Sequence, residues 1–262
     1  MSSISLIRGF VNHWLNAVDQ HSLHAPFAYN FYEQVILNNQ PEEIFQKIEA
    51  HRKAYLESKA TINVQSPGAP SRVSSRHLRK ISDIAAKGLT PARSSRLLYR
   101  IGQSLEPKVI VELGTSLGIN TLYLSSSWPH ATVYTFEGCP ETAAQARRLF
   151  TKWPCQNIRL IEGNIDETLP DLLSGIEDKI GLAYLDANHR YQPTLDYYQQ
   201  LRAHSTEESV LVLDDIYWSK GMKQAWKELC RRPEVSLSLD LYDMGILFFR
   251  NKPVKEHHYL RY

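Results

Sequence analysis

The chain of 262 residues has only three cysteines, and their number and spacing argue against both disulfide bonds and zinc binding by thiolates. Cys139, Cys155 and Cys230 form no C-x-x-C pair and no even set, so neither a disulfide framework nor a thiolate zinc site is expected. An excess of one charge is also missing. The 30 basic residues are balanced by 28 acidic ones, which leaves no overall field to attract nucleic acid or a membrane surface.

Long hydrophobic runs are absent as well. Polar residues such as Arg8, Asn12 and His13 interrupt the apolar positions of the first 19 residues, so no signal peptide is predicted. No later stretch is apolar enough to span a bilayer. We therefore expect a cytoplasmic protein without a membrane segment. A chain of this length can bury a sizeable core, as one large domain or as a domain with an appendage.

The most informative stretch that is present covers residues 109–121, VIVELGTSLGINT. Its first five residues are apolar apart from Glu112, and three are β-branched, which is typical of a strand buried on both faces. Gly114 and Gly118 then bracket a short turn before a helix. Such a turn lets a ligand approach the backbone, where free N–H groups bind its polar atoms. Its E-x-G-x-x-x-G spacing differs from the G-x-G-x-x-G of dinucleotide-binding proteins.

A second acidic residue follows at the end of the next predicted strand. Residues 131–136 alternate apolar and polar side chains and end at Glu137, which precedes Gly138. In nucleotide-binding βαβ units an acid about twenty residues beyond the glycine turn accepts hydrogen bonds from ribose hydroxyls. Taken alone, Glu137 is equally consistent with a surface glutamate. Together with Glu112 and the turn, we favour the ribose interpretation.

Strand and helix patterns alternate through the rest of the chain, which predicts a doubly wound, mostly parallel α/β sheet. Near the C-terminus, residues 235–241 and 246–249 are predicted strands joined by a short turn, so this pair must be antiparallel. The other predicted strands are residues 109–113, 131–136, 158–161, 180–185 and 210–213. The predicted helices between them are residues 91–105, 120–126, 140–153, 168–173, 193–204 and 222–229.

The first eighty residues have a different pattern. Residues 4–18, 26–37 and 41–56 are predicted helices with no convincing strand between them, and residues 66–71 are a loop or hinge by composition. Arg72, Arg76, Arg79 and Lys80 then form a basic cluster. A solvated face is expected there rather than a nucleic-acid patch. We expect an N-terminal helical cap over residues 1–78 and a second domain over residues 79–262.

The turn, Glu137 and a parallel sheet closed by a hairpin together resemble the class I S-adenosylmethionine-dependent methyltransferases. The resemblance covers residues 91–250. It implies a Rossmann-like, seven-stranded sheet with a C-terminal antiparallel hairpin strand, S-adenosylmethionine as the cofactor, and N-terminal helices that shape the acceptor pocket. It also implies a set of cofactor-binding residues, with Asn164 beside the adenine: Glu112, Gly114, Thr115, Ser116, Gly118, Asn120, Glu137, Gly138, Asn164 and Asp186.

Three carboxylates follow the fourth and fifth strands of the alternating series: Asp186, Asp214 and Asp215. The carboxyl ends of parallel strands meet at one edge of a sheet, so these acids should converge there. Converging carboxylates suit a hard cation with oxygen ligands, such as Mg²⁺. The set resembles the metal site of catechol- and sugar-type O-methyltransferases. In the alternative interpretation, Asp186 contacts the cofactor's methionine end and Asp214 caps the following helix.

His189 is the best candidate for the catalytic base, with Asp186 as its catalytic partner. It lies three residues after Asp186, where the catechol-type enzymes carry a lysine, and imidazole takes up a proton near neutral pH. Some sugar enzymes place the base one residue earlier, where this chain has Asn188. A loop histidine bonded to its neighbours is the alternative. Tyr191, Tyr217 and Trp218 would wall the acceptor site, although core packing explains aromatic residues there as well.

The sequence therefore predicts a methyltransferase of small-molecule O-methyltransferase type, using S-adenosylmethionine and with Mg²⁺ as a candidate second cofactor. The alternative is a non-catalytic protein on the same fold, which binds nucleic acid or a protein partner through the basic cluster. We expect a small hydroxylated acceptor as the partner and no nucleic acid, and a homodimer is left open.

Overall fold

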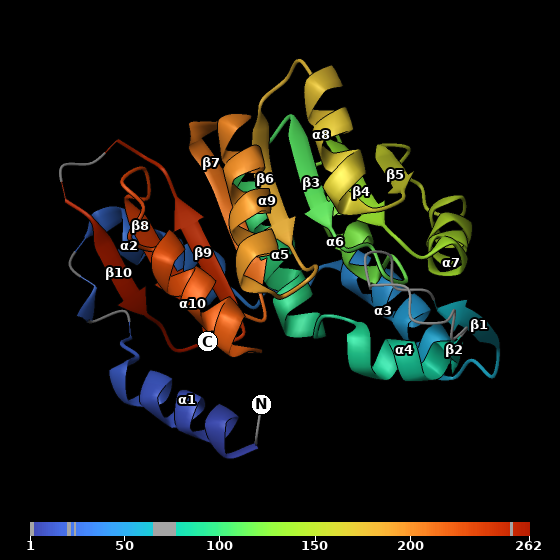
Figure 1. The fold of residues 1–262 in the computed structure, drawn as a ribbon, viewed down its shortest axis with the longest axis horizontal. Coiled ribbons are helices and arrows are strands. Elements are labelled where there is room, and N and C mark those ends of the chain that lie inside the picture. The colour runs from blue at the N-terminus through green and yellow to red at the C-terminus, as the bar shows by residue number, and fades with distance from the viewer. Residues whose placement is uncertain (1–2, 20–21, 24, 65–76, 252–253) are drawn as a thin grey trace. The chain divides into compact units, whose positions relative to one another are not determined.

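The computed structural model describes residues 3–19, 22–23, 25–64, 77–251 and 254–262 (Figure 1). Its contacts divide the chain into two compact units. The continuous unit is Gln40–Asp178, and the split unit combines Met1–Asn39 with Lys179–Tyr262. This division shares the N-terminal helices between the two units instead of separating residues 1–78. The predicted cap over the acceptor site therefore stays a prediction.

The continuous unit is built on three parallel strands in the order β3-β4-β5. All five residues of β3 are buried, as the run of β-branched residues predicts for a strand covered on both faces. The strands are β3 (Val109–Leu113), β4 (Thr132–Glu137) and β5 (Ile158–Glu162), and the helices that alternate with them are α5 (Ala92–Leu105), α6 (Ile119–Ser127), α7 (Pro140–Phe150) and α8 (Ile165–Gly175).

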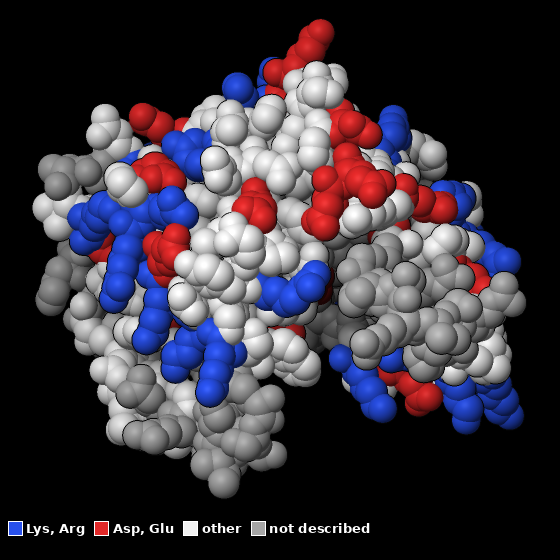
Figure 2. Space-filling model, in the orientation of Figure 1, with Lys and Arg blue, Asp and Glu red and all other residues white. Residues whose placement is uncertain are grey.

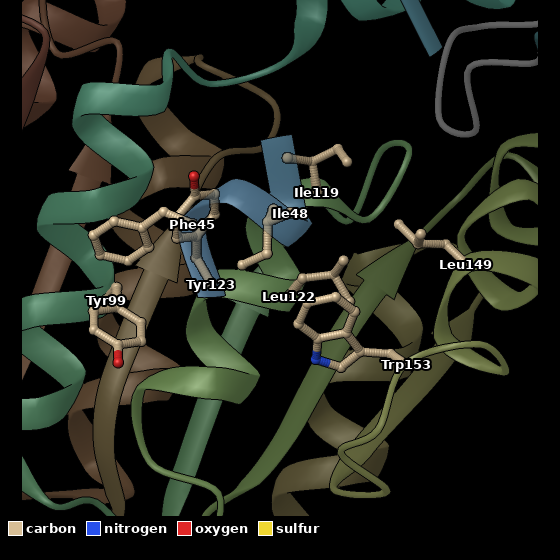
Figure 3. Close-up of a cluster of buried hydrophobic side chains, with 8 residues drawn as sticks. All are labelled: Phe45, Ile48, Tyr99, Ile119, Leu122, Tyr123, Leu149 and Trp153. Carbon is tan, nitrogen blue, oxygen red and sulfur yellow. The ribbon is translucent and has the colours of Figure 1, made fainter. Parts of the chain in front are cut away.

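A cluster of aromatic and aliphatic side chains forms one core of the continuous unit (Figure 3). Phe45 and Ile48 come from α3 (Glu43–Leu56), and they meet Tyr99 of α5 and Tyr123 of α6. The Phe45 and Tyr99 rings meet edge to face at 5.0 Å between centroids, which is a favoured geometry for aromatic pairs. Helix α3 thus contributes side chains to the core of this unit.

Two short strands that were not predicted follow the third N-terminal helix. A hairpin is formed by β1 (Thr61–Val64) and β2 (His77–Lys80), which pair antiparallel ahead of α4 (Ile81–Gly88). Each strand has only four residues, too few for alternation to be evident in the sequence. The predicted loop at residues 66–71 lies outside the described residues, as do Arg72 and Arg76 of the basic cluster. Arg79 and Lys80 are exposed.

The split unit contains five strands in the order β10-β8-β9-β7-β6. Strand β9 runs antiparallel to both β7 and β8, which confirms the predicted C-terminal hairpin. Helices α9 (Tyr191–Ala203) and α10 (Lys220–Leu229) pack beside each other in this unit (Figure 1). The strands are β6 (Ile180–Leu185), β7 (Ser205–Asp214), β8 (Leu237–Asp240), β9 (Met244–Phe248) and β10 (Glu256–Tyr259).

Strand β10 was not predicted. It pairs parallel with β8, and it brings the described paired strands beyond the β1-β2 hairpin to eight, one more than the expected seven. Its sequence, Glu-His-His-Tyr, lacks the alternating apolar pattern of a strand. A polar segment of this kind becomes a strand because the edge of β8 offers unpaired backbone groups.

The N-terminal residues of the split unit pack against its C-terminal strands. They comprise α1 (Ser3–Asn16), α2 (Pro26–Phe31) and a π-helical turn, η2 (Tyr32–Ile36). Val18 forms a parallel bridge with Leu260, and the hydroxyl of Tyr32 donates to the carbonyl of Arg261 at 2.7 Å across 229 positions of sequence. Phe31 packs edge to face on Phe248 of β9. None of the helices in the described part of the chain is long and apolar enough to cross a bilayer.

Candidate active site

The carboxylate of Glu112 is fully buried and organises the start of α6. It accepts hydrogen bonds from Thr121 Oγ1 at 2.5 Å, from Thr135 Oγ1 of β4 at 2.6 Å and from Asn120 Nδ2 at 3.3 Å. A buried carboxylate is costly unless donors of this kind surround it. Glu112 therefore fastens strand β3 to helix α6, which follows the glycine turn, and to the neighbouring strand β4.

The glycine turn adopts a backbone that favours glycine at both ends. Gly114 has φ of 107° and Gly118 has φ of 84°, in the region where a Cβ atom is unfavourable. A Cβ on Gly118 would also lie 2.7 Å from Cε1 of Phe150. The sequence prediction of a tight turn is met by this conformation, and any larger residue at position 118 is excluded by both strain and space.

Glu137 is tied to the same turn by backbone donors. Its Oε2 accepts from the N–H of Ser116 at 2.9 Å, and its Oε1 accepts from the N–H of Cys139 at 2.8 Å. Burial raises the pKa of Glu137, although the hydrogen bonds from the N–H groups of Cys139, Ser116 and Gly138 oppose that rise. A carboxylate has about four lone-pair sites, so one acceptor position is still open to a ligand hydroxyl.

The side chains of Asn120 and Asn164 differ in how fully they are bonded. Asn120 is buried, and its Oδ1 has no hydrogen-bond partner, which is unusual because a buried polar atom without a partner is costly. Asn164 caps α8 by accepting from the N–H of Asp166 at 3.2 Å. Thr115 is buried and shares a 2.6 Å hydrogen bond with Thr135. Of these three side chains, only that of Asn120 has a buried oxygen with no hydrogen-bond partner.

The split unit brings Asp186, Asp214 and Asp215 close enough to repel one another. Burial raises the pKa of Asp214 well above its usual value, and the charges of Asp186 and Asp215 raise it further. Burial also raises the pKa of Asp215, with the charges of Asp186 and Asp243 adding to the rise and that of His189 opposing it. The predicted convergence of three acids at the ends of β6 and β7 therefore exists in the structure.

His189 lies within this acidic cluster. Its Nε2 is 3.4 Å from Oδ1 of Asp186, and its buried Nδ1 has no partner. Burial alone would lower the pKa of His189, but the hydrogen bond and charge of Asp186, with the charge of Asp215, outweigh it and raise the pKa. This imidazole is oriented by a carboxylate through one nitrogen and leaves the other nitrogen unpaired, which is the arrangement expected of a base and its orienting acid.

The loop that carries His189 has an uncommon backbone. Asn188 has φ of 66°, His189 has φ of 37° and Asp215 has φ of 53°. Left-handed conformations in residues other than glycine are costly, and they cluster at functional sites. Asn188 is fixed by its side chain, whose Nδ2 donates to Tyr197 at 2.7 Å and whose Oδ1 accepts from Arg190 at 2.7 Å. Those bonds leave Asn188 less suited than His189 to accept a proton.

The three aromatic residues predicted to wall the acceptor site have different surroundings in the structure. Tyr191 donates to Glu228 at 2.5 Å and Tyr217 donates to Asp240 at 2.8 Å, while Trp218 is 60% exposed. Among the described residues, no three His, Cys, Asp or Glu side chains are grouped in a way that would hold a metal ion. The metal-binding role of the three acids is therefore still a prediction.

One buried pair was missed in the sequence. His13 of α1 lies 3.2 Å from Oδ1 of Asp240 at the end of β8, and both side chains are buried. In the sequence, His13 is only a polar residue that interrupts an apolar helix. Nothing in its neighbours indicates a partner 227 positions away, so only the tertiary structure reveals the pair.

Comparison with known proteins agrees with this site. Residues 111–216, which include the glycine turn, Glu137 and the acidic cluster, match the family model of a methyltransferase domain. A search of curated proteins finds no match. Solved structures similar to this chain include a methyltransferase from Podospora anserina bound to S-adenosylhomocysteine, at 15% identity and a TM-score of 0.60, covering 87% of this chain and 97% of the other.

Two further similar structures are described as O-methyltransferases. One is from Bacillus cereus in complex with S-adenosylhomocysteine, at 14% identity and a TM-score of 0.57, covering 83% of this chain and 94% of the other. The second is TomG from Streptomyces achromogenes in complex with S-adenosylmethionine, at 17% identity and a TM-score of 0.57, covering 86% and 96%. At these identities the similarity shows the fold.

The chain therefore has the class I methyltransferase fold, as the sequence predicted, and its residues 111–216 match a methyltransferase domain.

Proposed function

We propose that the protein is an S-adenosylmethionine-dependent O-methyltransferase that acts on a small hydroxylated acceptor. The observation that carries the proposal is the turn from Gly114 to Gly118, whose left-handed glycines and hydrogen bond to Glu137 would let a nucleoside approach the backbone. It lies within the matched methyltransferase domain. Similar structures that are described as O-methyltransferases in complex with S-adenosylmethionine or S-adenosylhomocysteine support the choice of cofactor and reaction.

In this proposal the continuous unit holds the nucleoside part of the cofactor. Glu137 would accept from a ribose hydroxyl at its remaining lone pair, and Asn120 would accept from the cofactor at its unpaired Oδ1. Thr115, Ser116 and Gly138 would contact it through backbone groups. When bound, S-adenosylmethionine supplies a methyl group already activated by a sulfonium. The protein then has to align the acceptor and remove its proton.

His189 would remove the proton from the acceptor hydroxyl at Nδ1. Asp186 accepts from Nε2 and fixes the ring, so the free nitrogen is the one that can take up a proton. Because the pKa of His189 is raised, the imidazole is neutral and able to act as a base only at a pH above the ordinary pKa of histidine. The 3.4 Å contact between His189 and Asp186 supports this assignment.

We further propose that Asp186, Asp214 and Asp215 bind Mg²⁺. The mutual repulsion of these acids supports it, since a cation would relieve that repulsion. No group of three or more His, Cys, Asp or Glu side chains that could hold a metal is found among the described residues, and the proton step above is proposed without one. Turnover that is lost in a chelator and restored by Mg²⁺ would support the proposed Mg²⁺ binding, and full turnover in the chelator would refute it.

A calorimetric titration with S-adenosylmethionine, with and without Mg²⁺, tests the proposed function. Saturable binding at one site per chain is expected, and it should be present without the metal because the turn and Glu137 make the contacts. No binding in either condition would contradict the proposal. A cytoplasmic location and a homodimer are further proposals, to be checked by fractionation and by light scattering.

A further inference from the structure

We infer that the split unit carries a second small-molecule site, a cavity between α10 and β10 that is suited to an aromatic ligand bearing phosphate groups. The cavity has a volume of about 370 Å³, within the range of ligand pockets, about 300–1,000 Å³. None of the residues that line it belongs to the acidic cluster of Asp186, His189, Asp214 and Asp215. It is therefore distinct from the site proposed for methyl transfer, and it does not depend on that proposal.

Aromatic side chains form the walls of this cavity. Tyr217 precedes α10, Trp226 lies on α10, and His257 and Tyr259 lie on β10. The rings of His257 and Tyr259 meet edge to face, with centroids 4.8 Å apart. Trp226 is 2% exposed, so its ring is held in a fixed position. Walls of this composition bind a flat ring through stacking and edge contacts.

Three cations border the same cavity along one face of α10 and just beyond it: Lys223, Lys227 and Arg231. Each is four residues from the next, and this spacing places successive side chains on one helical face, about 6 Å apart. Within the described part of the chain, none of the three forms an ion pair with a carboxylate. Figure 2 shows basic side chains gathered over the region of α10.

A fourth cation lies at the end of this row. Lys255 Nζ donates to the carbonyl of Arg231 at 3.3 Å and to that of Arg232 at 2.6 Å. At the other end, Lys223 Nζ is 5.2 Å from the centroid of the Tyr217 ring. The row therefore begins beside an aromatic wall and continues away from it. A ligand with a ring in the cavity and charged groups along α10 would meet both features.

The buried carboxylate beneath the cavity does not oppose an anion strongly. Asp240 accepts from the hydroxyl of Tyr217 at 2.8 Å, from Nε1 of Trp226 at 2.9 Å and from the N–H of Tyr242 at 3.0 Å. His13 lies 3.2 Å away. Burial would lower the pKa of His13, but its contacts with Asp240 outweigh this and raise it, which favours the charged imidazole as a counterion.

These observations favour phosphate over a single carboxylate as the charged part of the ligand. The cavity has several cations without acidic partners, which is more positive charge than a single carboxylate on the ligand would need. Lysine and arginine both bind phosphate oxygens through charge-assisted hydrogen bonds. No Asp or Glu lines the cavity. The chemical class is therefore an aromatic ring joined to a phosphate chain, and a nucleoside polyphosphate is a suitable probe.

Calorimetry with uridine 5′-triphosphate tests the inference. The titration is done with the protein saturated with S-adenosylhomocysteine, so that a nucleoside site in the continuous unit is already filled. Saturable binding that weakens as salt is raised is expected. The double variant Lys227→Gln/Arg231→Gln should lose at least about tenfold in affinity, because it removes two cations that would form charge-assisted hydrogen bonds to the phosphates. Both side chains are exposed, so the fold should be unaffected.

Two comparisons distinguish binding in this cavity from a general attraction of anions to basic side chains. Lys220→Gln removes the same charge from an exposed position on α10 outside the cavity, and it should leave the affinity unchanged. Inorganic triphosphate should bind more weakly than the uridine compound, and Tyr259→Leu should reduce that difference. Equal weakening by Lys220→Gln, equal binding of inorganic triphosphate, or no saturable binding at all would overturn the inference.

Discussion

The glycine turn of the continuous unit and the acidic cluster of the split unit satisfy their carboxylates in opposite ways. Glu112 and Glu137 are surrounded by hydroxyl and backbone donors. Burial raises the pKa of Glu137, Asp214 and Asp215 alike, but only at Asp214 and Asp215 do the charges of neighbouring acids raise it further. One region is therefore stable as it stands, whereas the other retains unfavourable charge.

In the proposed function, that difference separates cofactor binding from proton transfer. A surface that recognises a cofactor benefits from being fixed before the ligand arrives, since less entropy is lost on binding. A site that moves protons needs groups with shifted pKa values and an unpaired atom, as His189 has at Nδ1. The strained backbone at Asn188, His189 and Asp215 belongs to this second region. Variants in the two regions should therefore fail in different ways.

The largest effect is expected from His189→Ala. Loss of a positioned base should reduce kcat by about a hundred- to ten-thousand-fold, while the affinity for S-adenosylmethionine changes little. Asn188→Gly is the matched control, because glycine tolerates the φ of 66° at that position and removes the other candidate base. Measuring kcat and cofactor affinity in both variants shows which of the two residues acts as the base. If Asn188→Gly has the larger loss, the base has been misassigned.

Glu137→Ala should have the next largest effect, this time on binding. The change removes the proposed ribose acceptor and leaves the N–H groups of Ser116 and Cys139 without their partner. A loss of about 1–3 kcal/mol is expected, which is about five- to 150-fold in affinity. Glu162→Ala is a control from the paired position on β5. Calorimetry that gave equal affinity for both variants would show that Glu137 does not contact the cofactor.

The pH dependence of kcat should show a shifted histidine. Because the pKa of His189 is raised, the base is protonated and inactive over a wider range than usual. The acid limb of the profile should therefore have its midpoint above about 6.5, the ordinary value for histidine. In Asp186→Asn, which removes the main cause of the rise, this midpoint should move down. A midpoint that stays in place would show that another group controls the limb.

The smallest expected effect is a gain in stability from Asp214→Asn. A carboxyl whose folded pKa is raised favours the folded state when protonated, so its charge destabilises the protein above that pKa. Removing the charge should raise Tm at neutral pH by about 2–4 °C for each kcal/mol gained. The parent itself should become more stable as the pH falls through that pKa. Asp178→Asn, at an exposed position, should leave Tm unchanged in a thermal scan.

The two regions also differ in how far the sequence predicts them. The residues of the glycine turn lie close together in the chain, and their types alone indicate a short turn between Gly114 and Gly118, where the structure has positive φ at both glycines. Strands β3 and β6 occur at the predicted residues, because a run of β-branched and apolar side chains is a strong local pattern. Local chemistry of this kind is what a sequence records directly.

Contacts that depend on distant residues were not predictable. The donors that saturate Glu112 include Thr135, which lies 23 positions away, and no pattern indicates that it should donate to that carboxylate. Strand β10 forms only because β8 lies beside it. The direction of the His189 pKa shift likewise depends on a balance between burial and two acids, which requires the folded geometry.

The split unit has a consequence for the order in which the protein is made. Its N-terminal part bonds to residues near 260, as in the contacts of Val18 with Leu260 and Tyr32 with Arg261. The ribosome releases the chain from the N-terminus, and domains generally fold as they emerge. The continuous unit, Gln40–Asp178, is thus complete first. Helices α1 and α2 therefore lack these partners during most of translation. Apolar side chains such as Phe31 stay exposed, and accessible to chaperones, until β9 and β10 emerge.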